Sequence, residues 1–498
     1  MATVSNCLPD AGAGESSNRA LGVKQPSVAG VPNDTIEFEG RDDPAHPFNW
    51  SLPLKLRVSV SLGFATFTVG FNSSLFSSAI DALTREYRVS HTVATLGMSL
   101  YVLGFATGPI FWAPVSELKG RRGVILLGIL GFAIFSLGVA AATNIQTVML
   151  CRFWAGIFAA SPMTIAGAVF ADLFDGPTRG PATCIFSMNI LMGPMLAPSV
   201  GGFICQSSLG WRWTAWLGSL MGFAGFLLCA VLLKETYAPV LLTYKARARR
   251  LETGNWSWHS QHEATVLDGR TLVVTYLARP LRLLFTEPLV GLISVYLAFI
   301  YGLMYLFLTA YPMVFEGVHG FTPGLAGLAY LGIALGMLGG GICVMLTQPA
   351  YYRKLKANNG VIVPEWRLPP AMAGSAAFAV GIFWLGWSGY RRDIHWIVPV
   401  LSGLPTGFGL FCIFQQLLNY LFDIYLPYAA SVNAGSSVLR SLCGFGFPLF
   451  AKSMFDTLSI PWASTLLGCI AVLCVPLPFV CYRWGAQIRA KSKYCVQI

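Results

Sequence analysis

Long apolar stretches recur along the chain and are separated by short polar connections that hold most of the charged residues. Each stretch is roughly 20 residues long, the length at which an α-helix crosses a ~30 Å hydrocarbon core. The pattern therefore predicts an all-α polytopic membrane protein. We expect twelve transmembrane helices, near residues 56–80, 93–115, 123–142, 147–171, 182–205, 214–233, 289–313, 324–346, 370–388, 396–419, 429–451 and 462–482.

A polar, basic segment at residues 234–288 divides the predicted spans into two groups of six. Two six-helix halves joined in this way are typical of secondary transporters, whose substrate binds near the midplane between the halves. We therefore predict six-helix bundles at residues 56–233 and 289–482, joined by a central loop at 234–288. Residues 1–55, rich in Ser, Gly, Pro and acidic residues, are expected to form a disordered tail, and residues 483–498 a second tail.

The composition also favours a membrane protein. Hydrophobic residues make up 55% of the 498 residues and charged residues 11%, with a mean hydropathy of +0.62, whereas soluble domains carry about 25% charged residues. The net charge of +11 does not form a basic stripe beside aromatic residues on a soluble face, so nucleic acid is not an expected partner. Lys and Arg instead gather in the tails, in the central loop and in the connections that follow the even-numbered spans. By the positive-inside rule, both termini are expected in the cytoplasm.

Several motifs of catalytic chemistry are missing from the sequence. It contains no GxxxxGK[ST] phosphate loop, no GxSxG turn and no HExxH helix. Its six histidines are dispersed, and its twelve cysteines are scattered without a CxxC pair. We therefore expect no enzymatic activity, no cofactor and no metal site.

The second predicted span ends in GPIFWAPVSELKGRR, residues 108–122. Arginines in such a tight turn could bridge neighbouring helix ends, with a glutamate supplying the compensating charge. The alternative is an ordinary positively charged cytoplasmic turn. The candidate residues of this turn are Gly108, Pro109, Pro114, Ser116, Glu117, Gly120, Arg121 and Arg122.

Arg152 lies inside the fourth predicted span. A guanidinium held in the membrane interior is costly and tends to face the interior of the bundle or a watery cavity. Arg152 is therefore a functional candidate. The alternative is a structural side chain that extends to the cytoplasmic interface.

The fifth predicted span contains GPMLAPSVGG, residues 193–202. Small residues allow close approach between helices, and proline bends a span, so this stretch suits a hinge or a tight helix crossing. Packing of the kind found in many bundles is the alternative. The candidate residues are Gly193, Pro194, Pro198, Gly201 and Gly202.

Together these strings resemble the major facilitator superfamily, in the form of its fungal drug:proton antiporters with twelve spans. Residues 108–122 are similar to the family's loop signature, Arg152 to its RxxxG motif, and residues 193–202 to its antiporter motif, in which Ala197 replaces a Gly of many relatives. The resemblance implies that residues 108–122 form a cytoplasmic gate loop. It also implies that Arg152 takes part in proton coupling and that residues 193–202 mark export.

Three shorter strings resemble the same fungal relatives: DPAHPFNW at residues 43–50, WRW at 211–213 and ETYAPVLL at 235–242. The similarity therefore covers the N-terminal half well. The C-terminal half resembles the family mainly through its pattern of spans and the region around Arg440.

The acidic residues indicate which substrates the chain could carry. None lies clearly at the centre of a span, where a carboxylate would hold a cationic drug or an exchanged proton. A neutral or weakly acidic, partly aromatic substrate is therefore expected. Arg440 would suit an anionic or phenolate molecule. The polar residues that could line the pathway, each of which could instead bond a neighbouring helix, are Asn72, Ser73, Asn189, Tyr301, Tyr305, Gln415, Gln416, Asn433 and Arg440.

The leading hypothesis is a monomeric, multi-pass exporter in the plasma membrane, driven by protons and working by rocking of its two halves. Its partners are the lipid bilayer, protons and a small hydrophobic substrate. A secondary metabolite or toxin, exported for self-protection, is preferred as that substrate. A multidrug or polyamine pump, a proton-coupled nutrient importer and a sensor that transports nothing are the alternatives.

Overall fold

The computed structural model describes residues 35–40, 43–174, 176–264, 278–490, 492 and 494. Most of the tail expected at residues 1–55 lies outside these residues, as do residues 495–498. Within the described part the chain is built from helices, and its β-structure amounts to one isolated bridge between Thr35 and His259.

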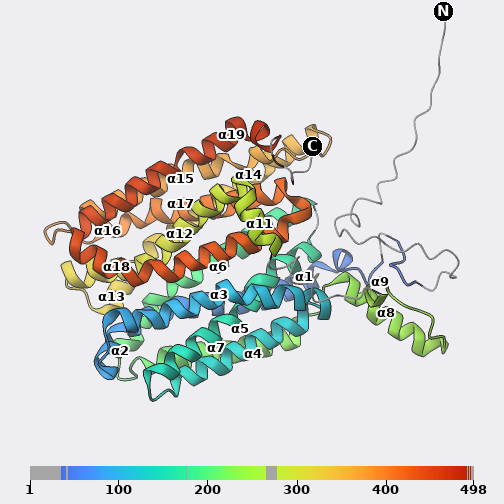
Figure 1. Ribbon diagram of the computed structural model, residues 1–498, viewed down its shortest axis with the longest axis horizontal. Coiled ribbons are helices and arrows are strands. Elements are labelled where there is room, and N and C mark those ends of the chain that lie inside the picture. Colours follow the sequence, from blue (N-terminus) through green and yellow to red (C-terminus); the bar gives the residue numbers. More distant parts are fainter. Residues whose placement is uncertain are drawn as a thin grey trace, which may run out of the picture.

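Before the central segment, the chain folds into six long helices and one short helix (Figure 1). They are α1 (Leu52–Leu75), α2 (Ile80–Tyr87), α3 (His91–Lys119), α4 (Arg121–Ala140), α5 (Ile145–Leu173), α6 (Gly176–Gln206) and α7 (Arg212–Leu232).

After the central segment, the helices are more often interrupted. They are α12 (Pro288–Pro312) with a π-helical extension at Met313–Val318, α13 (Pro323–Leu328), α14 (Leu331–Ala357), α15 (Pro369–Ser388), α16 (Ile397–Leu401), α17 (Gly403–Ile424), α18 (Ala429–Cys474) and α19 (Pro476–Arg489).

The predicted number of twelve spans is confirmed. Among the described residues, eleven helical stretches are long and apolar enough to cross a membrane, but the last, Leu426–Arg489, is 64 residues long. Ser459 breaks this stretch with φ 63° and ψ 163°, and Pro461 follows, which cannot donate a helical hydrogen bond. The stretch therefore holds two spans, one on each side of Ser459.

The ends of the first helices follow from local sequence. Ser90 caps α3 by accepting a hydrogen bond from the Val93 amide at 3.3 Å, and Asn144 caps α5 by accepting one from the Thr147 amide at 2.8 Å. Between α3 and α4 the chain turns at Gly120, whose φ of 90° is a conformation that favours glycine. A single residue therefore separates two spans.

The central segment contains helices that the sequence analysis did not predict. These are α8 (Ala238–Thr253), α9 (Gln261–Ala264) and α11 (Arg279–Thr286). Helix α8 extends away from the spans, on the side where the described N-terminal segment also lies (Figure 1). We call this end of the molecule the α8 end, and the opposite end, where α2, α13 and α16 lie, the α2 end.

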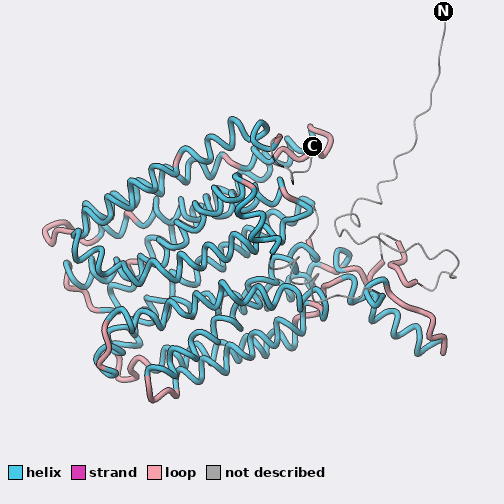
Figure 2. The backbone as a smooth tube through the Cα atoms, in the orientation of Figure 1, coloured by secondary structure: helices cyan, strands magenta, loops and turns pink. Residues whose placement is uncertain are grey.

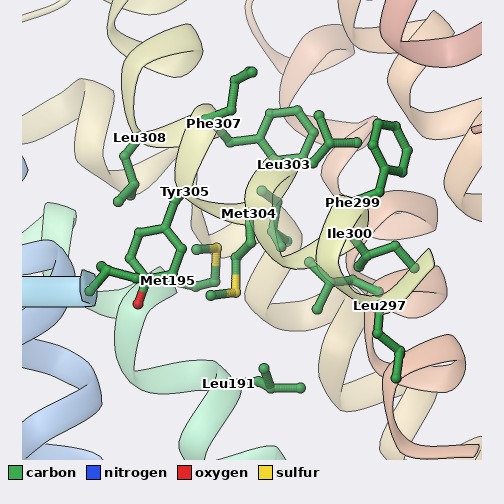
Figure 3. Close-up of a cluster of buried hydrophobic side chains, with 14 of the residues drawn as sticks. Leu191, Met195, Leu297, Phe299, Ile300, Leu303, Met304, Tyr305, Phe307 and Leu308 are labelled. Atoms are coloured by element: carbon green, nitrogen blue, oxygen red, sulfur yellow. The ribbon is translucent and has the colours of Figure 1, made fainter. Parts of the chain in front are cut away.

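The spans lie side by side, with most of the loops between them at the two ends (Figures 1 and 2). They form two groups that meet along two seams. Along one seam α3 packs against α18, and along the other α6 packs against α13 and α14. Figure 3 shows Leu191 and Met195 of α6 beside apolar side chains of α12, including Tyr305. One hydrophobic cluster therefore extends across both halves.

Candidate functional site

The predicted gate loop, residues 108–122, is mostly helical: residues 108–119 form the last part of α3, Gly120 forms the turn at the α8 end, and Arg121 and Arg122 begin α4. The carboxylate of Glu235 accepts hydrogen bonds from the backbone amides of Arg121 at 2.8 Å and Arg122 at 3.0 Å. A carboxylate in this position caps the helix and complements the positive end of its dipole. A Cβ at Gly120 would lie 2.4 Å from Oε2 of Glu235, so glycine is required for both space and backbone conformation.

The Arg121 side chain connects α3 and α5 to the central segment. Its Nη1 donates to Ser116 Oγ at 2.8 Å, its Nε lies 3.6 Å from Asp172 Oδ2, and the guanidinium lies 4.6 Å from the ring centre of Tyr237. The sequence analysis assigned the compensating charge to Glu117. In the structure, Asp172 at the end of α5 supplies a carboxylate beside Arg121.

The other residues of the loop fix how α3 and α4 lie against their neighbours. Arg122 Nη2 donates to the Ala230 carbonyl of α7 at 2.8 Å. A Cβ at Gly108 would lie 2.8 Å from the Ile157 carbonyl of α5, so the two helices nearly touch there. Pro109 is buried in the same stretch and Pro114 is half-buried.

A matching cluster lies in the C-terminal half and was missed by the sequence analysis. Arg367, just before α15, pairs with Asp423 near the end of α17, and Arg489 pairs with Glu365 at 2.7 Å. Arg367 and Asp423 occupy the positions in spans eight to ten that Arg121 and Asp172 occupy in spans two to four. Comparing the two six-span repeats residue by residue would have revealed them.

Arg152 is buried in the interior of the bundle, with 2% of its surface exposed. Its Nε donates to the Gly97 carbonyl at 3.1 Å, and Nη1 and Nη2 donate to the Asn72 carbonyl at 3.3 and 3.4 Å. The guanidinium also lies over the rings of Phe76 and Tyr101, at 4.6 and 4.4 Å. Arg152 therefore holds α5 to α1 and α3 through backbone carbonyls and aromatic faces.

The antiporter-like stretch, residues 193–202 of α6, lies between the two halves. On one side, a Cβ at Gly193 would lie 2.9 Å from the Phe71 amide of α1. On the other, a Cβ at Gly202 would lie 2.4 Å from the Pro323 carbonyl of α13, and Ser199 Oγ donates to the Gly327 carbonyl at 2.8 Å. One short stretch therefore touches its own half and the opposite half at the α2 end.

The same stretch makes further contacts with its own half. A Cβ at Gly201 would lie 2.7 Å from Ser78 Oγ and 2.9 Å from the Leu75 carbonyl. Pro194 and Pro198 lie inside α6, and the Pro198 carbonyl accepts a hydrogen bond from Ser78 at 3.4 Å.

Some of the residues predicted to line the pathway meet between the halves. Ser73 Oγ of α1 lies 2.9 Å from the Tyr305 hydroxyl of α12, which lies 3.5 Å from the Tyr301 hydroxyl. Arg440 of α18 is buried near Tyr301.

Other predicted lining residues lie apart from this group. Asn189 donates to the Gly63 carbonyl at 2.7 Å and so joins two helices of one half. Gln415 and Gln416 are buried in α17, and Asn433 is half-buried near the start of α18.

Two narrow hollows lie beside these residues: the first leaves no room for a water molecule, and the second has a cavity volume of about 20 Å³. Both are smaller than the roughly 300–1,000 Å³ typical of pockets for small molecules, so neither could hold a drug-sized substrate. The first is lined by Asn72, Phe76, Ser136, Val139, Arg152, Thr214 and Ala215, and the second by Thr347, Gln348, Tyr351, Trp366, Arg367 and Gln416.

Twelve spans in two six-helix groups, with matched ion pairs at one end, define a transporter fold. The sequence of residues 62–448 matches the protein family described as the Major Facilitator Superfamily. The solved structure of the proton:xylose symporter XylE has the same fold, with a TM-score of 0.62 at 17% identity over 87% of this chain and 96% of that chain.

The chain belongs to the major facilitator superfamily, and it is a membrane transporter rather than an enzyme. It is 45% identical to the multidrug transporter FLU1 of Candida albicans, over 98% of this chain and 79% of that protein. It is 39% identical to the multidrug transporter TPO1_2 of Candida glabrata, over 96% of this chain and 83% of that protein.

Proposed function

We propose that this transporter exports a small hydrophobic compound, neutral or weakly acidic, in exchange for protons. The observation that carries the proposal is the contact of residues 193–202 with both halves at the α2 end. If the two halves rock about a central site, this crossing must open to release the substrate and close again afterwards. Arg152, bonded to α1 and α3, would couple proton movement to that motion.

A secondary metabolite or toxin is the preferred substrate. Its apolar surface would suit the aromatic residues between the halves, such as Tyr301 and Tyr305, which offer hydroxyl groups to a neutral or weakly acidic molecule. A general multidrug pump is the second candidate, because FLU1 and TPO1_2 are both described as multidrug transporters.

The α8 end is proposed to face the cytoplasm, in the plasma membrane of the cell. Lys119, Arg122, Lys234 and the basic helix α8 all lie at this end, and positive charge is retained on the cytoplasmic side. Both termini would then be cytoplasmic. We propose domain boundaries as in the sequence prediction, with bundles at residues 56–233 and 289–482.

The test is transport in sealed membrane vesicles of known orientation, with Nile red as an uncharged hydrophobic probe. Exchange for protons predicts that inside-out vesicles accumulate the probe when their interior is acidified, and that a protonophore abolishes the accumulation. Vesicles without the protein are the control. Accumulation only in right-side-out vesicles would indicate an importer, and flux that ignores the gradient would contradict proton coupling.

A further inference from the structure

Two arginines are buried among the spans, and their hydrogen bonding differs. Arg152 directs its guanidinium at the backbone carbonyls of Gly97 and Asn72. Arg440 is 9% exposed, and its Nη1 is buried without a hydrogen-bond partner. None of the ion pairs formed by the described residues includes Arg440. Because a guanidinium in a protein does not lose its proton, this charge is permanent.

Arg440 lies on the face of α18 that meets other helices at a seam between the halves. Gly444, one turn further along α18, packs against Val102 of α3 and Tyr301 of α12, where a Cβ would lie 3.0 and 3.1 Å from their side chains. Residues four apart share one face of a helix. Arg440 is therefore on the side of α18 that faces both halves.

The same face carries a second polar group without a partner. Ser436, one turn before Arg440, is fully buried, and its Oγ has no hydrogen-bond partner. Buried polar groups are normally bonded, and two orphaned groups on one helix face indicate a missing partner. Since one of them is a cation and the other a hydroxyl, a negatively charged acceptor fits both.

Two aromatic residues lie near the guanidinium, and one of them leads to the other half. The Arg440 guanidinium lies 4.9 Å from the ring centre of Phe414. Tyr301 interacts electrostatically with Arg440, and its hydroxyl leads through Tyr305 to Ser73 of the N-terminal half. The surroundings therefore combine a fixed positive charge, hydroxyl groups and apolar surface.

We propose that Arg440 binds the anionic group of the transported compound, which is an amphipathic organic molecule carrying one carboxylate or phenolate. This inference rests on the proposed function. A buried cation without a counter-charge is costly, so an anion that pairs with it is bound preferentially. Guanidinium and carboxylate match in geometry, and Phe414 and Tyr301 supply a surface for the apolar part of the molecule.

The test compares two molecules that differ in charge and share one ring system, 1-naphthoate and the uncharged 1-naphthamide. Binding of each radiolabelled probe is measured on the purified full-length chain in lipid nanodiscs at pH 7. We expect naphthoate to bind at least about tenfold more tightly, since hydrogen bonds to charged groups contribute about that much. Arg440→Gln should abolish this preference by lowering the affinity for naphthoate to about that for naphthamide. Arg483→Gln, which removes an exposed arginine, is the matched control.

A second variant keeps the test decisive if Arg440→Gln does not fold. Ser436→Asp adds a carboxylate one turn from Arg440, where it would form an ion pair with the guanidinium and so exclude a bound anion. We expect this variant to lose naphthoate binding, keep naphthamide binding and unfold at a higher temperature than the parent chain. Naphthoate binding that survives in Arg440→Gln or in Ser436→Asp would overturn the proposal, as would equal affinity for the two probes.

The anion site and the proposed export can fail separately. Gradient-driven movement of Nile red without any preference for naphthoate would overturn the anion site and leave the exporter standing. Naphthoate binding that depends on Arg440, in vesicles that move no probe, would support the site and contradict export.

Discussion

At the residue scale, single polar groups hold the ends and the interiors of the spans in place. Glu235 caps α4 from a distant part of the sequence, Arg121 at the start of α4 contacts α3 and α5, and Arg152 links α5 to α1 and α3. The contacts of Glu235 and Arg152 join parts of the molecule that the chain does not connect directly. Changes at these residues should therefore affect the relative positions of helices more than the helices themselves.

Replacing Arg152 by Ala is expected to abolish gradient-driven efflux while the protein still folds. The change removes the charge and leaves the carbonyls of Gly97 and Asn72 without their donors, at a cost of about 1–3 kcal/mol in unfolding free energy. Probe accumulation in inside-out vesicles measures transport, and thermal unfolding in detergent measures stability. Efflux at the parental rate would remove Arg152 from the coupling role.

Replacing Gly120 by Ala is expected to destabilise the gate loop. At φ 90° and ψ 169° a non-glycine residue is strained by about 1–3 kcal/mol, and the new Cβ would also press on Glu235. The thermal unfolding midpoint should fall. Gly123→Ala in the same helix is the matched control, because a Cβ there meets nothing within 4 Å. Equal midpoints for the two variants would contradict this account.

At the element scale, the crossings of α6 with α1 and of α6 with α13 depend on small residues. Gly193 and Gly202 let backbones approach to distances that no side chain allows, and Ser199 adds a hydrogen bond across the seam. Small residues of this kind allow the backbones of two helices to pack in close contact. The stretch is therefore both a packing motif and a boundary between the halves.

Replacing Gly202 by Ala should hinder closure of the α2 end, because the new Cβ would lie 2.4 Å from the Pro323 carbonyl. We expect slower transport and faster modification of a cysteine introduced at Ser199. The control, Gly339→Ala in α14, places its Cβ where nothing lies within 4 Å. Unchanged labelling at position 199 would show that the crossing tolerates the extra carbon.

At the scale of the whole molecule, the segment before the first span is joined to the central segment. Lys245 of α8 lies 3.1 Å from Glu39 and 3.2 Å from the buried Asp43, and the Ile36 amide donates to the His259 carbonyl at 3.0 Å. The string DPAHPFNW thus has a structural partner that lies about 200 residues away in the sequence. Backbone amides of Glu39 and Ala45, together with Lys245, lower the pKa of Asp43.

A lowered carboxyl pKa predicts how this joint responds to acid. Its stabilising effect is complete above the ordinary carboxyl pKa of about 3.9 and is lost as the pH falls through the lower pKa of the folded state. Limited proteolysis should therefore cut the parent chain near residues 35–50 only below about pH 4 and cut Lys245→Ala there already at neutral pH. Equal cleavage of the parent chain and Lys245→Ala would contradict the joint.

Much of the fold could be predicted from the sequence, and the candidate site only in part. Span positions follow from hydrophobic length, which is a local property, and the observed helices begin within a few residues of the prediction. The helix α8 was not predicted, because its amphipathic sequence is short and lies in a polar segment. The pairs Arg367–Asp423 and Arg121–Asp172 join residues more than 50 positions apart, so no local pattern reveals them.

The sequence by itself determined the twelve spans, the six-and-six division and the family-like strings, because hydrophobic length and short motifs are local features. Only the tertiary structure decided which groups find partners. Arg152 and Arg440 look alike in the sequence, as single arginines within apolar spans. Packing supplies Arg152 with two backbone carbonyls as acceptors and leaves Arg440 with an unpaired Nη1. The difference arises because hydrogen bonding in a bundle depends on helices that are far apart along the chain.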